Sequence, residues 1–384
     1  MRPAARVQAA IEILDEIVAG APAERALTGW ARRSRFAGSK DRAAIRDHVY
    51  DVLRQRQSCQ AVGGALSGRA LMVGLLSLQG VDLEGVFTGG PFAPGALSPD
   101  EMPRALPQDV FDLPSWSHAE LRRTLGDEFE PVAVALRDRA PTILRANLRK
   151  TTRDAARQKL DVDGTTTEPH PHSATALIVT EGARKIAQSD AYKTGLVELQ
   201  DASSQAAIEA LPLKDGMRVV DYCAGGGGKL LAMAGRIEGR FFAHDAHVQR
   251  LKDLPERAKR AGVSAKILTT QELPGHAPFD LVFCDVPCSG SGSWRRDPEG
   301  KWRMNAEGFQ ELLALQNNIL SDAAALVAPQ GHLIYATCSM CHSENAGQIE
   351  QFTQHNPHWQ VVAQQQLTPL QGFDGFYYAH MMRI

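Results

Sequence analysis

Two cysteines, Cys288 and Cys338, each follow an apolar run that predicts a β-strand. The first lies in Asp285-Val-Pro-Cys, and the second lies in Tyr335-Ala-Thr-Cys, 50 residues further on. A cysteine thiolate is among the best side-chain nucleophiles near neutral pH. Two thiols at strand ends, both downstream of a glycine-rich loop, therefore predict covalent chemistry on a bound substrate.

The elements that position these thiols are expected from about residue 200 onward, where apolar strands alternate with helical stretches. This alternation is typical of a parallel sheet with helices on both faces. Ligands in such folds bind outside the carboxyl ends of the strands, where Asp221, Asp245, Asp285 and Cys338 fall. The expected strands are Met217–Cys223, Arg240–Asp245, Ala265–Thr269, Phe279–Asp285 and His332–Cys338.

The first of these strands runs into the glycine-rich segment Asp221-Tyr-Cys-Ala-Gly-Gly-Gly-Gly-Lys-Leu. Consecutive glycines allow close approach of a ligand to the backbone, and Asp245 after the next strand can bind both ribose hydroxyls of an adenosine. The dinucleotide pattern fails because Leu230 stands where its third glycine is required. The P-loop pattern fails because Lys229 is followed by leucine. S-Adenosylmethionine requires neither motif and fits this loop, and a purely structural tight turn is the alternative.

The same residues suit methylation of a pyrimidine ring. Carbon 5 of cytosine becomes nucleophilic enough to take a methyl group once a thiolate has added at carbon 6. An acid at ring N3 assists that addition, and a base must later remove the proton from carbon 5. Asp285 is placed to hold N3, and two thiols on adjacent strand ends supply the remaining groups.

The segment before residue 200 divides into three parts. Residues 1–85 show helical spacing of apolar residues, and the basic run between residues 32 and 46 is either a solvated helix face or a phosphate-contacting surface. Residues 89–107 are rich in glycine and proline and predict a linker or long loop. Residues 110–195 predict a small α/β subdomain with strands in Thr142–Asn147 and Thr175–Thr180. The basic run comprises Arg32, Arg33, Arg35, Lys40, Arg42 and Arg46, opposed only by Asp41.

Composition sets the outer limits of function. The 384 residues suffice for two or three domains, and 43% apolar content is ordinary for a globular protein. No apolar run reaches the ~18 residues that span a bilayer, and acidic residues interrupt the N-terminal apolar segment, so we expect a cytoplasmic protein without membrane contact. Six cysteines are few for this length and predict reduced thiols. A formal net charge of -2 leaves local nucleic-acid binding open.

Taken together, these motifs resemble the RsmB/Sun-type RNA (cytosine-5)-methyltransferases over nearly the whole chain. The N-terminal part, with Ser39-Lys-Asp-Arg and Val49-Tyr-Asp-Val-Leu-Arg, resembles the NusB-like RNA-binding domain of the bacterial members. The further matching segments are Gln200 to Gln205, Asp221 to Lys229, Asp245 to Leu251, Asp280 to Gly292, Arg295 to Pro298 with Trp302, Thr337 to Ser339 with Glu344-Asn345, and Asp374 to Ala379.

The resemblance implies a fold of three parts. These are an all-α NusB-like domain over residues 1–130, a small α/β (RRM-like) subdomain over 131–198, and a catalytic domain over 199–384. The last is expected to be a class I S-adenosylmethionine-dependent methyltransferase with a Rossmann-like sheet. The resemblance also implies RNA as the partner, with small-subunit ribosomal RNA as the expected substrate. We further expect a monomer that needs no metal.

The resemblance also assigns roles to individual residues. Cys338 becomes the nucleophile at carbon 6, Cys288 assists proton removal and product release, and Asp285 serves both catalysis and cofactor binding. The implied cofactor-binding residues are Cys223, Ala224, Gly225, Gly226, Gly227, Gly228, Lys229, Asp245, Arg250, Thr270 and Asp285.

Two departures from the family pattern bear on cofactor affinity. The usual Ala-Pro-Gly-Gly-Lys is replaced by a glycine run that lacks the proline, which predicts a more flexible loop. The acid that commonly follows the third strand is replaced by Thr269-Thr270-Gln271. Thr270 or Gln271 is then expected to hydrogen-bond the adenine instead.

The same residues also fit other functions and roles. The same chemistry on transfer RNA or another RNA fits the motifs, as does an RNA-binding assembly factor with little turnover. A zinc site or a redox Cys-x-x-Cys is disfavoured by the strand and turn contexts of the cysteines. Glu344 either caps a helix or acts in catalysis. The basic and aromatic residues that follow Cys288 are either a charged loop or a platform for an unstacked base, and they comprise Trp294, Arg295, Arg296, Lys301, Trp302 and Arg303.

Overall fold

The computed structural model describes all residues from 1 to 384 and divides the chain into two compact units. The helical unit comprises Met1–His118, Asp127–Arg139 and Trp294–Arg303. The sheet unit comprises Ala119–Gly126, Ala140–Ser293 and Met304–Ile384. The finer division at residues 130 and 198 stays a prediction.

The helical unit is built on amphipathic helices whose apolar faces form one core. Val7, Ile11 and Leu14 are buried as their spacing predicts, whereas Val18 at the end of the same helix is 40% exposed. Helices α4 and α5 pack closely, since a Cβ added to Gly74 of α5 would lie only 2.0 Å from the Cys59 carbonyl oxygen of α4. The helices of this unit are α1 (Pro3–Val18), α2 (Ala23–Arg33), α3 (Ser39–Arg54), α4 (Arg56–Gly63), α5 (Gly68–Leu78), α7 (Phe129–Ala135) and α14 (Gly300–Arg303).

The predicted loop at residues 89–107 is confirmed. Its one regular piece is a single 3-10 turn at Pro99–Glu101, and proline and glycine prevent a longer helix or strand. Arg69 on α5 donates to Glu101 over 2.5 Å and to the carbonyl oxygens of Gly95 and Ala96. A second bond, from the Arg104 N–H to the Val62 carbonyl oxygen of α4 over 2.8 Å, also ties the loop to the helices.

The sheet unit begins with a small four-stranded antiparallel sheet of order β2-β3-β1-β4. Both strands expected here are present, and Leu144 and Leu177 bury their side chains against Leu160 of α8. The elements of this sheet are β1 (Ile143–Ala146), α8 (Arg153–Val162), β2 (Thr166–Pro169), β3 (Ala176–Glu181), α9 (Asp190–Lys193) and β4 (Val197–Leu199).

A seven-stranded sheet of order β10-β11-β9-β8-β5-β6-β7 follows. Its five strands from β5 to β9 are parallel in the doubly wound order, and β11 and β10 add antiparallel strands at one edge. The predicted Rossmann-like fold is thus confirmed. The strands are β5 (Arg218–Asp221), β6 (Arg240–Ala243), β7 (Ala265–Ile267), β8 (Phe279–Asp285), β9 (Val327–Thr337), β10 (Trp359–Leu367) and β11 (Phe376–Arg383).

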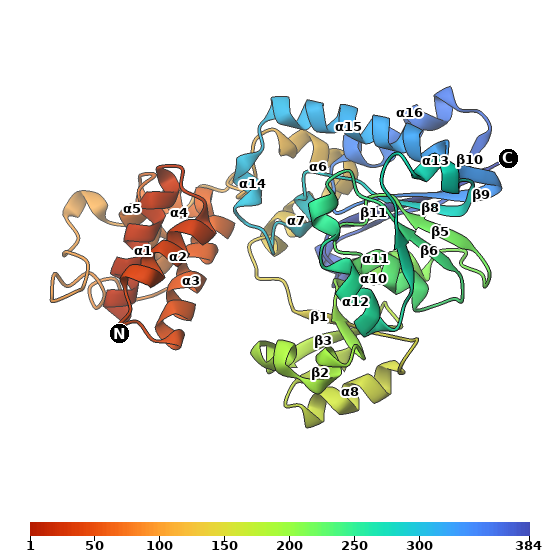
Figure 1. The fold of residues 1–384 in the computed structure, drawn as a ribbon. Helices are drawn as coiled ribbons and strands as arrows, with labels where there is room; N and C mark the ends of the chain where they lie inside the picture. The colour runs from red at the N-terminus through yellow and green to blue at the C-terminus, as the bar shows by residue number, and fades with distance from the viewer. The chain divides into compact units, whose positions relative to one another are not determined.

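Helices cover both faces of this large sheet (Figure 1). Adjacent residues of one strand face opposite sides, so Val219 joins the core beneath α10 to α12 and Val220 joins the core beneath α15 and α16. The remaining helices of the chain are α6 (Ser117–Leu125), α10 (Ala202–Glu209), α11 (Gly228–Ala234), α12 (Leu254–Ala261), α13 (Leu273–His276), α15 (Ala306–Ala324) and α16 (Ala346–His355).

None of the individual helices combines the length and apolar content needed to cross a bilayer. Helices α4 and α5, which are bent by 98° relative to each other, reach the required length and apolar content only when they are counted as one segment.

Candidate active site

The carboxyl ends of four neighbouring parallel strands carry the predicted site residues. Asp221 ends β5, Asp285 ends β8, and Cys338 follows β9 directly. Asp245 lies just beyond the end of β6. Because β6, β5, β8 and β9 are consecutive in the sheet and parallel, these ends meet along one edge.

The glycine loop turns sharply between β5 and α11. Gly225 and Gly227 adopt φ angles of 49° and 77°, a left-handed conformation that L side chains rarely adopt. The Gly225 N–H donates to Asp245 Oδ2 over 3.0 Å, and the Arg250 guanidinium lies 3.3 Å from the same carboxyl group. The predicted loop, the predicted ribose-binding acid and Arg250 are therefore in direct contact.

Two other predicted cofactor-binding residues, Ala224 and Thr270, join this arrangement through His244. The Ala224 N–H donates to the His244 carbonyl oxygen over 2.8 Å, and His244 Nε2 lies 3.0 Å from the Thr270 hydroxyl. Cys223 is partly buried, and burial raises the pKa of its thiol. Thr270 is thus linked to the loop through His244, and its role in cofactor binding stays a prediction.

The chemistry of this pocket fits an adenosine-type cofactor with an amino acid end. Asp245 presents a buried carboxylate beside the glycine turn. Asp221 is also buried, and its Oδ1 has no hydrogen-bond partner within the protein. Burial raises the pKa of Asp221 to about 7, and the nearby charge of Asp285 acts in the same direction. An unpartnered buried carboxyl oxygen is matched by a ligand donor such as an ammonium group.

Lys229 links the glycine loop to the reactive part of the site. Its Nζ lies 2.5 Å from Asp285 Oδ2, and 18% of the lysine side chain remains exposed. Burial favours the neutral amine, but the charge of Asp285 and the hydrogen bond to it outweigh burial, and the pKa of Lys229 is raised. Lys229 therefore carries a positive charge beside Asp285 at neutral pH.

The two predicted thiols are in contact. Cys288 Sγ lies 3.2 Å from Cys338 Sγ, and both residues are partly buried. Ser293 Oγ approaches Cys338 Sγ from the other side at 3.9 Å. Two sulfurs this close can act on neighbouring atoms of one substrate ring, which is what a nucleophile and a proton-transfer partner require.

The electrostatic environment distinguishes the two sulfurs. The hydrogen bond from Cys288 lowers the pKa of Cys338 against burial, and the Lys229 charge and Ser293 act in the same direction. The same hydrogen bond raises the pKa of Cys288, with burial and the Cys338 charge adding to it. Cys338 is the one thiol in the chain whose pKa is lowered, because burial raises those of Cys59, Cys223, Cys284 and Cys341.

A buried carboxylate joins the two loops that carry these thiols. Glu344 has no exposed surface and accepts from the Ser289 N–H over 2.7 Å and from the Ser289 hydroxyl over 2.5 Å. It also accepts from the hydroxyl of Ser339 and, over 2.9 Å, from Gln316. Ser289 follows Cys288 and Ser339 follows Cys338, so Glu344 fixes the two thiol loops relative to each other.

The sequence left Glu344 open between a helix cap and a catalytic group. The structure excludes the helix cap, because α16 has no side-chain cap and the contacts of Glu344 lie across the thiol loops. The neighbouring Asn345 extends the same network by donating to the Ser339 carbonyl oxygen over 2.9 Å. The Glu344-Asn345 motif in the sequence indicated a functional segment. That these two residues link the loops carrying Cys288 and Cys338 could be seen only in the structure.

The interpretation of residues 294–303 as an exposed base-stacking platform is wrong. Trp294 is 1% exposed and Lys301 has no exposed surface, because this segment packs within the helical unit. The Trp302 indole donates to the Leu53 carbonyl oxygen, and Lys301 Nζ donates to that of Arg54 over 2.7 Å. Burial lowers the pKa of Lys301 to about 7. These residues are structural.

The remaining cysteines do not gather around a metal. Cys284 is fully buried in the core beneath α15, and Cys341 is buried with Ser291 Oγ 3.6 Å from its sulfur. No group of three or more histidine, cysteine or acidic side chains is arranged to hold a metal ion.

The doubly wound sheet, the glycine turn and the carboxylate at the end of the second strand together define the Rossmann-like methyltransferase fold. Residues 208–382 match the model of the family described as 16S rRNA methyltransferase RsmB/F. Residues 113–185 match the RsmF/B-like ferredoxin-like domain. The chain belongs to the RsmB/F methyltransferase family, and its cofactor is S-adenosylmethionine.

Individual relatives agree with this membership. The chain is 31% identical to ribosomal RNA small subunit methyltransferase B of Erwinia tasmaniensis over 284 residues, which are 70% of this chain and 66% of that protein. It is 28% identical to the Vibrio cholerae protein of the same name over 387 residues, with 88% of this chain and 89% of the relative covered. The crystal structure of PH0851 superposes with a TM-score of 0.75 at 22% identity, and 99% of each chain is covered.

Proposed function

We propose that this methyltransferase modifies carbon 5 of a cytosine in RNA, with small-subunit ribosomal RNA as the substrate. The observation that carries the proposal is the contact of two thiols at adjacent strand ends, 3.2 Å apart, beside the Lys229–Asp285 pair. Methyl transfer to an oxygen or an exocyclic nitrogen needs no thiol, whereas carbon 5 of a cytosine requires one to activate the ring. The names of the relatives support ribosomal RNA as the substrate.

In the proposed reaction, the Cys338 thiolate forms a bond to carbon 6 of the cytosine. The displaced electron pair moves through the ring toward N3, which takes a proton from the Asp285 carboxyl group after that group has received the proton from the Lys229 ammonium. Lys229 at 2.5 Å offsets the charge on this carboxyl group between steps. Breaking the carbon 5–carbon 6 double bond in this way makes carbon 5 a nucleophile.

S-Adenosylmethionine, held by the glycine loop and Asp245, supplies an electrophilic methyl group on a sulfonium sulfur. After transfer, carbon 5 carries both the methyl group and a hydrogen. Cys288 is protonated while Cys338 is a thiolate, because the hydrogen bond to Cys338 and the charge of Cys338 raise its pKa. Once Cys338 is bonded to carbon 6 both effects are lost, Cys288 releases its proton to solvent, and the resulting thiolate takes the proton from carbon 5. The electron pair left on carbon 5 restores the double bond and expels the Cys338 thiolate.

We further propose that the helical part, residues 1–130, binds RNA phosphates. A groove between α2 and α3 is lined by Arg32, Arg35, Arg42 and Arg46, and of these Arg46 has a carboxylate, Glu24, within 3.9 Å. Clustered guanidinium groups of this kind neutralise phosphates and make affinity fall steeply with salt. Replacing Arg32 and Arg35 with glutamate should weaken RNA binding and reduce the slope of its salt dependence by about two phosphates.

The activity is tested by methyl transfer to RNA. Purified full-length protein is incubated with S-adenosylmethionine labelled in the methyl group and with separate fractions of small-subunit ribosomal RNA and transfer RNA. The proposal predicts label in 5-methylcytidine after digestion, in the ribosomal fraction. Label in transfer RNA alone would move the substrate to that class, label in another nucleoside would refute the cytosine chemistry, and RNA binding without transfer would favour the assembly-factor alternative.

A further inference from the structure

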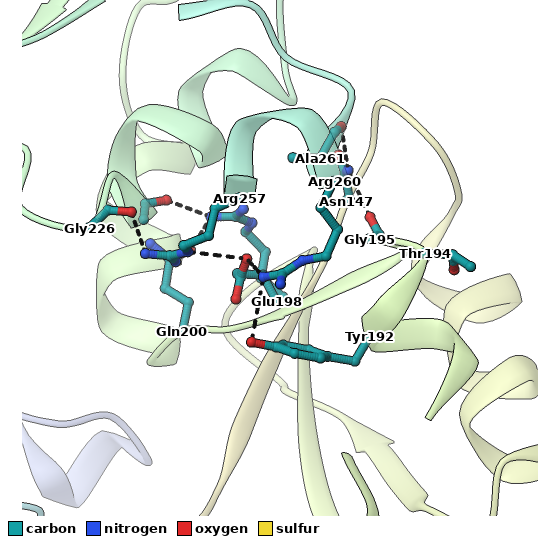
Figure 2. A network of polar contacts seen from close by, with 12 residues as sticks. Asn147, Tyr192, Thr194, Gly195, Glu198, Gln200, Gly226, Arg257, Arg260 and Ala261 are labelled. Atoms are coloured by element: carbon teal, nitrogen blue, oxygen red, sulfur yellow. Dashed lines mark hydrogen bonds and ion pairs between the residues drawn. The ribbon is translucent and has the colours of Figure 1, made fainter. Parts of the chain in front are cut away.

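The carbonyl oxygens of the glycine loop are held by two arginines that the sequence motifs do not include. Arg257 Nη1 donates to the Gly226 carbonyl oxygen (Figure 2). Arg145 Nη1 donates to the Gly228 carbonyl oxygen over 2.7 Å. Arg257 lies on α12 and Arg145 on β1 of the small sheet, so both contacts reach the loop from outside its own strand and helix.

Arg257 is itself anchored by an acid from the small sheet. Glu198 on β4 is 6% exposed, and its Oε2 lies 3.5 Å from Arg257 Nε and 2.8 Å from Arg260 Nη2. The Arg260 guanidinium also lies over the Tyr192 ring at 4.5 Å from its centroid. Figure 2 shows Glu198 between the two arginines, with Arg257 reaching on toward Gly226. A buried carboxylate thus orients the guanidinium group that binds the loop.

The small sheet also caps the helices that flank the loop. Arg149 donates to the Ala234 carbonyl oxygen at the end of α11, and Asn147 donates to the Ala261 carbonyl oxygen at the end of α12. Lys150 binds the neighbouring Arg260 carbonyl oxygen over 2.6 Å. The last carbonyl groups of a helix have no partner within it, and donors there stabilise the helix. The small sheet therefore supports the cofactor loop from both sides.

The loop needs such support because four consecutive glycines are costly to order. Counted back from Lys229, the proline of the usual family pattern falls at Gly226. Gly226 does not adopt a positive φ, unlike Gly225 and Gly227. A Cβ added at Gly226 would lie 2.6 Å from Arg257 Nη1. A side chain at position 226 and the Arg257 contact therefore compete for the same space.

We propose that Arg257, oriented by Glu198, is a positioning residue for S-adenosylmethionine, and that its bond to Gly226 replaces the rigidity of the missing proline. The small ferredoxin-like sheet thereby becomes part of the cofactor site. The inference concerns cofactor affinity and holds whichever RNA is the substrate.

The test measures affinity for S-adenosylhomocysteine by isothermal titration with the full-length protein. Arg257→Met should weaken binding about tenfold, the equivalent of one charge-assisted hydrogen bond, and Glu198→Gln about threefold. Lys259→Met removes a charge from an exposed neighbour on the same helix and should leave affinity within twofold. Hydrogen exchange of residues 224–230 should accelerate in Arg257→Met and stay unchanged in Lys259→Met. Unchanged affinity and exchange in a folded Arg257→Met protein would overturn the proposal.

A second variant separates positioning from a general loss of stability. Gly226→Pro alone should weaken binding, because the new ring displaces the Arg257 guanidinium. Combined with Arg257→Met, the same proline should restore affinity to within about threefold of the original protein, since it supplies rigidity without a clash. If the proline weakens binding equally in both backgrounds, Arg257 does not substitute for it and the proposal fails.

Discussion

The loops that follow β8 and β9 each carry one thiol, yet they give their sulfurs opposite properties. Cys338 receives hydrogen bonds from Cys288 and Ser293 and faces the charge of Lys229, so its pKa is lowered. Cys288 donates to Cys338 and is desolvated by burial, so its pKa is raised, and the charges of Cys338 and Glu344 act in the same direction. Two identical side chains 3.2 Å apart are thereby made unequal, one suited to hold negative charge and the other to hold a proton.

The largest effects should come from removing each thiol in turn. Cys338→Ala should lower methyl transfer at least about a thousandfold and abolish any covalent protein–RNA complex, because no other thiol has a lowered pKa. Cys288→Ala should instead let the covalent complex accumulate, because the carbon 5 proton is no longer removed. Denaturing gel electrophoresis of protein incubated with RNA and S-adenosylmethionine detects the complex.

The same two variants can also show that the roles of the two thiols are assigned the wrong way round. A complex that forms without Cys338 and requires Cys288 would show that the roles of the two sulfurs are exchanged. Cys59→Ala serves as the control, since that thiol is buried in the core of the helical unit and should neither trap nor abolish the complex.

The next effect concerns the carboxylate that links the two loops. Glu344→Gln keeps the shape of the side chain but presents an amide to the donors of Ser289, Ser339 and Gln316. We expect kcat to fall about 10- to 100-fold through misalignment of the thiols, and the free energy of unfolding to fall by about 1–3 kcal/mol. Steady-state kinetics and denaturant titration measure both quantities.

A suitable control for this change is Glu350→Gln on α16, an exposed acid close in sequence to Glu344. Its kcat and stability should match those of the original protein. Equal losses in the two variants would mean that Glu344 contributes only through net charge.

The difference between the two thiols also predicts how alkylation of Cys338 depends on pH. Alkylation by iodoacetamide follows the thiolate fraction, which rises as pH increases through the thiol pKa. Because the pKa of Cys338 is lowered, its alkylation should reach half its maximal rate at a lower pH than that of an ordinary exposed thiol. Cys288→Ala should shift this midpoint to higher pH, because the hydrogen bond that stabilises the thiolate is lost. Mass spectrometry of the Cys338 peptide follows the reaction, and an unshifted midpoint would contradict the pairing.

The smallest effect is expected from Ser293, whose hydroxyl lies 3.9 Å from the Cys338 sulfur. Ser293→Ala should raise the same midpoint by less than Cys288→Ala does and should reduce kcat less than about threefold. A shift larger than that of Cys288→Ala would make the serine, rather than the second thiol, the main stabiliser of the Cys338 thiolate.

Much of the fold was predictable because local patterns determine it. Apolar runs of strand length, each followed by a helical stretch, predicted the five parallel strands, and the rule that ligands bind at strand ends predicted that Asp221, Asp285 and Cys338 would meet. The segment 294–303 was misjudged because interleaved basic and aromatic residues have the same pattern on an exposed platform and in a buried packing layer. Only the contacts of Trp302 and Lys301 with backbone oxygens decided between them.

The sequence by itself determined the chemistry available to this protein: two thiols, a glycine turn and the carboxylates that follow successive strands. The tertiary structure alone decided how these groups interact. The unequal pKa values of Cys288 and Cys338, the link through Glu344 and the arginine contacts on the glycine loop all join residues distant in sequence. Residue type and spacing fix which bonds a side chain can make, whereas its charge and reactivity depend on neighbours that only folding brings within a few ångströms.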